Sequence, residues 1–203
     1  MLQLFQQTCG INTVMYYGPD IIIDSGVHFG NLPAGDPRTG IVFSIPLSLV
    51  NALGSLVVIF YIDKLGRRYI FLRCLPGITF SLIGVAFSMY LSGYYQKDSL
   101  THEIGSFMAL AFVILYLGFF SIGMSGTVWS VNTEIYPIQL AGTANSLATA
   151  TNWLSNFLVS SLFLTITSTK TGNVYAYLIL ASFSVSAWFF IYFLLPETNN
   201  KTI

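Results

Sequence analysis

Six long apolar stretches fill the chain almost from end to end, at residues 2–25, 40–62, 69–90, 104–135, 143–166 and 174–195. A helix needs about 20 apolar residues to cross the hydrocarbon core of a bilayer, and each stretch reaches that length. The stretches lack the period-two alternation of half-buried strands, and a backbone in lipid must satisfy its own hydrogen bonds. The pattern therefore predicts an all-α membrane protein with six transmembrane helices.

The composition supports a membrane protein and argues against several other classes. With 54% hydrophobic and 8% charged residues, the chain is too apolar for a soluble domain of its length. The formal net charge is zero, so no basic face for nucleic acid is expected. His28 and His102 are expected in solvated loops, without neighbours at metal-ligand spacing, and Cys9 and Cys74 are expected to be buried and unpaired. We expect no cofactor, no metal and no intramembrane enzyme.

Basic residues predict the orientation of the chain. Lys64, Arg67, Arg68 and Arg73, half of the 8 basic residues, surround the short loop between the second and third stretches. Cytoplasmic loops carry an excess of Lys and Arg, so this loop is predicted to face the cytoplasm. Alternation along the six helices then places both termini on the cytoplasmic side.

Carboxamide side chains interrupt several of the apolar stretches. They belong to Gln6, Gln7, Asn12, Asn51, Asn152 and Asn156. An unpartnered amide in hydrocarbon is costly, so such groups face one another, water or a polar solute. Amides donate and accept hydrogen bonds, as sugar hydroxyls do, and the indole of Trp129 offers a stacking surface for a sugar ring. Asn152 and Asn156 are four residues apart and share a helix face. A polar binding cavity is one interpretation, and hydrogen bonding between helices is the other.

Glycines precede Trp129 in the fourth stretch, at Gly118, Gly123 and Gly126. Glycines soften a helix for gating, or allow a neighbouring helix to pack closely, and the pattern alone leaves both open. In the first stretch, Gly10 and the Gly18-Pro19 pair permit bending or local unwinding, which is typical of helices that line transport sites.

Charged residues gather at the predicted cytoplasmic ends of the stretches. Asp63 can pair with Arg67 or Arg68, and Glu134 and Glu197 follow the fourth and sixth stretches. Such charges can hold helices together in one conformation and release them in another. Alternatively, they mark only where the membrane ends.

These segments together resemble the sugar porter family of the major facilitator superfamily, specifically its C-terminal six-helix half. The resembling segments are Gln6-Gln7-x-x-Gly10-Ile11-Asn12, Tyr16-Tyr17, Asp63-Lys64-Leu65-Gly66-Arg67-Arg68, Trp129 with Glu134-Ile135-Tyr136-Pro137, Asn152-Trp153 with Asn156, and Pro196-Glu197-Thr198. The resemblance implies that Gln6, Gln7, Asn12, Asn51, Trp129 and Asn156 contact the sugar and that Tyr16 and Tyr17 form an outer gate. The segment 129–134 is similar to proton-coupled myo-inositol and hexose transporters.

The chain departs from the family pattern at several positions. Ala141 stands where the family usually has an Arg that pairs with the inner charges, and Asn199 follows Thr198 where a Gly is usual. Gly126 and Val128 replace prolines before Trp129. These departures predict that the charge cluster, formed by Asp63, Arg67, Arg68, Glu134 and Glu197, is weak or rewired.

The leading hypothesis is the substrate-binding half of a hexose or myo-inositol transporter, with residues 1–203 as one six-helix bundle. Because family members have twelve spans and alternating access needs two bundles, transport is expected to require an N-terminal bundle. A plasma or vacuolar membrane is expected, and coupling to protons is left open. The alternative is a membrane sugar sensor or assembly subunit that does not transport.

Overall fold

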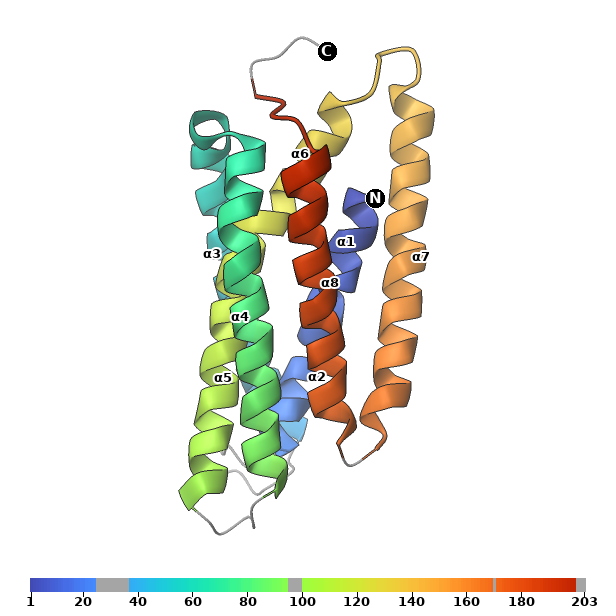
Figure 1. Cartoon of the computed structure of the whole chain (residues 1–203). Helices are drawn as coiled ribbons and strands as arrows, with labels where there is room; N and C mark the ends of the chain where they lie inside the picture. The colour runs from blue at the N-terminus through green and yellow to red at the C-terminus, as the bar shows by residue number, and fades with distance from the viewer. Residues whose placement is uncertain (25–36, 95–99, 170, 200–203) are drawn as a thin grey trace.

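The computed structural model describes residues 1–24, 37–94, 100–169 and 171–199, which contain helices and no strand. The elements are α1 (Leu2–Thr8), α2 (Ile11–Asp24), α3 (Pro37–Leu65), α4 (Arg67–Tyr94), α5 (Leu100–Phe120), the π-helix η1 (Ser121–Ser125), α6 (Gly126–Glu134), α7 (Ala141–Thr167) and α8 (Gly172–Leu194). The long helices run side by side as one elongated bundle (Figure 1). The predicted all-α fold is therefore confirmed.

Four of the described segments are long and apolar enough to cross a membrane: Gly40–Leu65, Arg67–Gly93, Leu100–Glu134 and Gly172–Leu194. The first predicted stretch is instead two helices, because Gly10 adopts a left-handed φ of 91° between α1 and α2. The fifth lies within α7, which is long enough but carries many Asn, Ser and Thr residues. The number and bounds of the membrane spans therefore stay a prediction, and the structure divides the first predicted stretch at Gly10.

Helix α4 forms the centre of the core, because it packs against both α5 and α8. Gly77 and Gly84 of α4 lie against the rings of Phe119 and Phe112 of α5, where a Cβ atom would collide with the ring. Close approach at small residues is a main source of helix association in membranes. Helix α3 is much less covered: 18% of its most apolar window is buried, compared with 56% for α4. One side of the bundle is therefore open along α3.

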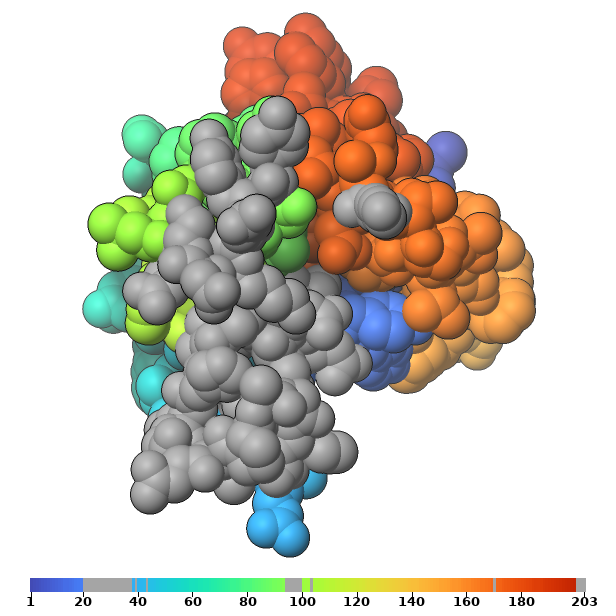
Figure 2. Space-filling view, turned by 90° about the horizontal axis from the view of Figure 1, so that it is seen from below, coloured from blue at the N-terminus to red at the C-terminus, as the bar shows by residue number. Residues whose placement is uncertain are grey.

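The charged segments lie together at one end of the bundle. The turn between α3 and α4, the connection from α6 to α7 and the segment after α8 are all at the top of Figure 1. The opposite end, shown in Figure 2, has α7 and α8 side by side and part of α2 next to α7. The grouping of the charged segments at one end agrees with the predicted alternation of the helices. That this end faces the cytoplasm stays a prediction.

His102 corrects the expectation of a solvated loop histidine. It lies in the first turn of α5 and is buried, because α5 begins before the predicted apolar stretch and continues to pack on α4. At Gly105 a Cβ atom would already lie 3.0 Å from the backbone nitrogen of Ser92. His28 lies outside the described residues. Cys9 and Cys74 are buried and unpaired, as predicted.

Candidate functional site

A polar cavity of about 340 Å³ lies among α1, α2, α3, α6 and α7. Its lining consists of Gln6, Gln7, Ile11, Asn12, Asn51, Phe120, Ser125, Gly126, Trp129 and Asn152. Six of the seven residues predicted to bind substrate are among them, although they come from segments far apart in the sequence. The seventh, Asn156, lies elsewhere.

Asn152 is the centre of the hydrogen-bond network along one wall of the cavity. Its Nδ2 donates to Gln3 Oε1 at 2.6 Å and to Gln6 Oε1 at 2.8 Å. Its Oδ1 accepts from Gln7 Nε2 at 3.0 Å, and Gln7 Oε1 accepts from Asn12 Nδ2 at 2.9 Å. The amide groups that join the helices therefore also line the cavity.

The π-helix η1 provides a second anchor for this wall. Gln6 Nε2 donates to the carbonyl oxygens of Met124 at 2.8 Å and Ser125 at 3.2 Å. A π turn inside an α-helix disturbs the regular ladder, and such turns are frequent at functional sites. Gln6 thus connects α1 to the end of the π turn, immediately before Trp129 enters the cavity on α6.

The opposite wall of the cavity has a polar group without a hydrogen-bond partner among the described residues. Asn51 Oδ1 is buried and has no hydrogen-bond partner among the described residues, although Asn51 lines the cavity. Trp129 is 39% exposed, so part of its indole is open to the hollow. By contrast, both N–H groups of Gln6 and of Asn152 are engaged. A buried polar atom without a partner can be satisfied by a ligand, and Asn51 is therefore the most available acceptor.

Asn156 lines a separate cavity of about 360 Å³, together with Tyr16, Tyr17, Trp153, Phe157, Ser160, Ser161 and Leu164. It is one turn further along α7 than Asn152, so the shared face of these two residues spans both cavities. Its Oδ1 accepts a hydrogen bond from Ser160 Oγ at 3.2 Å. Asn156 is thus placed with the predicted gate residues Tyr16 and Tyr17 rather than with the other amides.

The glycines before Trp129 have different surroundings. Gly126 lines the polar cavity. Gly123 lies against Cys74 of α4, where a Cβ atom would collide with the Cys74 Cβ. Of the two interpretations of these glycines, gating and close packing, the surroundings of Gly123 therefore support close packing.

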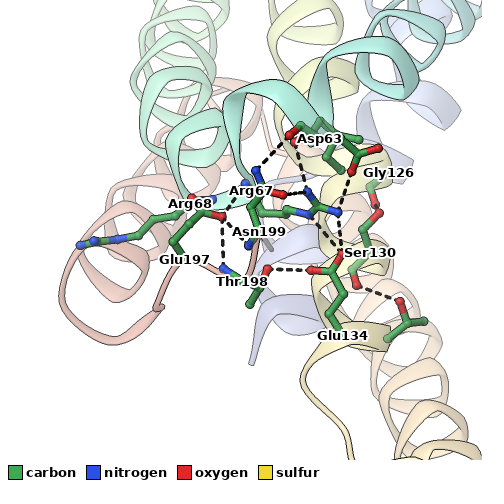
Figure 3. A network of polar contacts seen from close by, with 11 residues as sticks. Asp63, Arg67, Arg68, Gly126, Ser130, Glu134, Glu197, Thr198 and Asn199 are labelled. Carbon is green, nitrogen blue, oxygen red and sulfur yellow. Dashed lines mark hydrogen bonds and ion pairs between the residues drawn. The ribbon is translucent and has the colours of Figure 1, made fainter. Parts of the chain in front are cut away.

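Arg67 is the centre of the charge cluster (Figure 3). Its guanidinium donates to Glu134 Oε1 at 2.7 and 3.1 Å, lies 2.9 Å from Asp63 Oδ1, and donates to Asn199 Oδ1 at 3.0 Å. Glu134 also accepts a hydrogen bond from Thr198 Oγ1 at 2.7 Å. The side chain of Arg67 is only 11% exposed, so these charge-assisted bonds are partly shielded from solvent.

Glu197 caps the N-terminus of α4. Its two carboxylate oxygens accept from the backbone N–H groups of Arg67 at 2.9 Å and Arg68 at 3.1 Å. The first N–H groups of a helix lack partners in the helix, and a carboxylate there also interacts favourably with the helix dipole. The close approach of Glu197 to the start of α4 requires a glycine at position 66. Gly66 has a φ of 85°, and a Cβ atom at this position would lie 2.7 Å from Glu197 Oε2.

The expected weakening of the charge cluster by Ala141 does not prevent its assembly in this structure. Thr198 and Asn199 supply bonds to Glu134 and Arg67 that the motif pattern did not predict. The side chain of Arg68 lies outside the ion pairs, since its Nη2 donates to the carbonyl oxygen of Tyr192 at 2.7 Å. The rewired cluster therefore uses Asn199 at the position where the family pattern has a glycine.

Gln3 was also missed, although it is part of the amide network. It lies three and four residues before Gln6 and Gln7, so helical spacing would have placed all three near one face.

Comparisons with known proteins agree along the whole chain. The family model described as "Sugar (and other) transporter" matches residues 1–203. The chain is 36% identical over 205 residues to Sugar transporter ERD6-like 8 of Arabidopsis thaliana and 29% identical over 293 residues to Proton myo-inositol cotransporter hmit-1.2 of Caenorhabditis elegans. All of the chain is covered in both cases, but only 40% and 46% of those proteins.

The structure is also similar to that of the proton:xylose symporter XylE of the major facilitator superfamily, bound to 6-bromo-6-deoxy-D-glucose. The TM-score is 0.73 at 27% identity, with 100% of this chain and 40% of XylE covered. The chain thus spans less than half the length of these relatives.

Replacing Asn152 tests the amide network. Asn152→Leu should lower the free energy of unfolding by about 3 kcal/mol, because Gln3, Gln6 and Gln7 each lose a buried partner. Asn156→Leu is the matched control on the same helix, since among the described residues Asn156 bonds only to Ser160 of α7, and its cost should stay below about 1 kcal/mol. Unfolding of the purified chain in detergent measures both. Equal losses in the two variants would contradict the central role of Asn152.

Exchanging arginine for lysine tests the charge cluster. Arg67→Lys should lower the free energy of unfolding by about 2 kcal/mol, because an ammonium group cannot reach Glu134, Asp63 and Asn199 simultaneously. Arg68→Lys replaces a guanidinium whose one described bond is to Tyr192 and should cost less than half as much. Thermal unfolding in detergent compares the two, and a larger loss in Arg68→Lys would contradict this assignment.

Proposed function

We propose that this chain, which belongs to the sugar (and other) transporter family, is the substrate-binding half of a carrier for a monosaccharide or polyol such as a hexose or myo-inositol. The chain is an integral membrane protein with an all-α fold related to that of XylE. The observation that carries the proposal is the cavity of about 340 Å³ in which carboxamides and an indole meet. Pockets for small ligands have this size and a few convergent polar groups.

In this proposal the two walls of the cavity have different roles. Gln6 and Asn152 hold the wall in place, because their N–H groups are already bonded. Asn51, Asn12 and the remaining N–H of Gln7 bond the hydroxyls of the sugar, while Trp129 stacks on the apolar face of its ring. Asn156, with Tyr16 and Tyr17, contacts the sugar as it passes through the adjoining hollow. Binding is weak, since a carrier must release what it takes up.

A second six-helix bundle would complete the carrier. The relatives ERD6-like 8 and hmit-1.2 are more than twice as long as this chain, and α3 is open along one side. We place the N-terminal bundle over that side, with the cavity between the halves. Alternating access would then result from rocking of one bundle against the other around the site. The charge cluster would hold its end of the bundle in one conformation and separate in the other.

The predicted orientation places the charge cluster and both termini in the cytoplasm, in a plasma or vacuolar membrane. Support for this comes from Lys64, Arg67, Arg68 and Arg73 near the turn between α3 and α4. Of the similar proteins, hmit-1.2 and XylE are described as a proton cotransporter and a proton symporter. We therefore propose in addition that transport is coupled to protons.

Reconstituted uptake tests the proposal. Labelled glucose and myo-inositol should enter vesicles that contain this chain together with a separately expressed N-terminal bundle, and should not enter with either part alone. A pH gradient should increase the rate if transport is coupled to protons. Uptake by this chain alone would contradict the need for a second bundle, and sugar binding without uptake in the complete assembly would favour the sensor.

Asn51→Ala should weaken sugar binding by the assembled carrier by about ten-fold, because one hydrogen bond to a sugar hydroxyl is lost. Stability should change little, since Asn51 Oδ1 has no partner among the described residues. Leu56→Ala is the control: Leu56 is five residues further along α3, is 51% exposed, and does not line the cavity. Quenching of tryptophan fluorescence by added sugar measures both affinities. The site assignment is wrong if the two variants bind equally well.

A further inference from the structure

The break between α1 and α2 leaves a buried carbonyl group without its helical partner. In a continuous helix the Cys9 carbonyl would accept from the backbone N–H of Thr13. Here the Gly10 N–H bonds to Gln7 O at 2.9 Å and the Val14 N–H bonds to Gly10 O at 2.9 Å. No backbone N–H of the described residues reaches the Cys9 carbonyl, and Cys9 is fully buried.

Tyr116 of α5 supplies the missing donor. Its hydroxyl donates to the Cys9 carbonyl oxygen at 2.9 Å, and its side chain is fully buried. An unsatisfied carbonyl costs far more inside a bundle at membrane depth than in water. The break is therefore compatible with a dry interior because a side chain 107 residues away completes its hydrogen bonding.

The break is held from a second side by α8. Leu180 lies against Gly10, where a Cβ atom would be 2.5 Å from Leu180 Cδ1. Gly10 itself has a φ of 91°, which other residues rarely adopt. The angle between α1 and α2 is thus fixed between Tyr116 on one side and Leu180 on the other.

That angle sets the geometry of the amides. Gln6 and Gln7 lie on α1, before the break, and Asn12 lies on α2, after it. The bond of 2.9 Å from Asn12 Nδ2 to Gln7 Oε1 crosses the break, so its length depends on the relative orientation of the two helices. We propose that Tyr116 is a positioning residue, whose hydroxyl bond to the Cys9 carbonyl fixes the α1–α2 break and thereby the amides of the cavity. The effect of the Tyr116 bond on sugar affinity rests on the proposed function, whereas its effect on the α1–α2 break does not.

Tyr177 of α8 provides a matched control. It is also fully buried, but its hydroxyl has no partner among the described residues. Tyr116→Phe and Tyr177→Phe therefore remove the same atom from two buried rings, and only the first removes a bond to the break.

Cys9 and Cys74 serve as natural reporters, because both are buried and unpaired, one at the break and the other on α4. The purified chain is treated with N-ethylmaleimide in detergent, and modification of each cysteine is followed by mass spectrometry of its peptides. Tyr116→Phe should accelerate modification of Cys9 about ten-fold, because the Cys9 carbonyl loses its hydrogen bond and the break opens more often. The rate of modification of Cys74 should stay unchanged. Tyr177→Phe should change neither rate.

Equal acceleration of Cys9 and Cys74 would show general loosening of the fold and would overturn the proposal, as would an unchanged Cys9 rate. Because no sugar is present, this outcome is independent of the transport proposal. In the assembled carrier, Tyr116→Phe should also weaken sugar binding about ten-fold relative to Tyr177→Phe. Unchanged affinity alongside selective modification of Cys9 would overturn the positioning role.

Discussion

The interior of this bundle depends on one constraint, that a polar group at membrane depth is costly unless it finds a hydrogen-bond partner. Asn152 meets this constraint by bonding to Gln3, Gln6 and Gln7 simultaneously. The same constraint acts on the backbone, where Gln6 engages carbonyls at the end of the π turn and Tyr116 engages the carbonyl freed at the α1–α2 break. Irregular backbone and amide side chains therefore occur together because each satisfies the other.

Helix α6 connects the cavity to the charge cluster. It is only nine residues long, with Trp129 in the cavity and Glu134 at the end that bonds to Arg67. Trp129 and Glu134 are therefore little more than one helical turn apart on the same short helix. At its other end, α6 follows the π turn to which Gln6 is bonded. The polar wall, the stacking surface and the charged end are thus linked through a few consecutive turns of one chain segment.

Much of the fold could be predicted from the sequence because hydrophobic length and helix formation are local properties. The apolar stretches predicted helices, and the carboxamides within them predicted a cavity to which Gln7, Asn51 and Asn152 contribute. Properties that depend on tertiary contacts could not be predicted in this way. Asn156 shares a face with Asn152, but the neighbouring helix changes from α1 to α2 within one turn. His102 is buried because α5 continues to pack on α4 beyond its apolar stretch.

The charge cluster shows why a missing motif residue does not imply a missing interaction. Ala141 removes one expected cation, yet Glu134 keeps both oxygens occupied, one by Arg67 and one by Thr198. A carboxylate accepts hydrogen bonds from hydroxyl and guanidinium groups alike, so neutral donors can replace a charge without leaving the acceptor unsatisfied. Such a replacement reduces the number of charges that the cluster holds together. Under the proposed function, such an exchange would favour a cluster that assembles in one conformation and costs less free energy to open in the other.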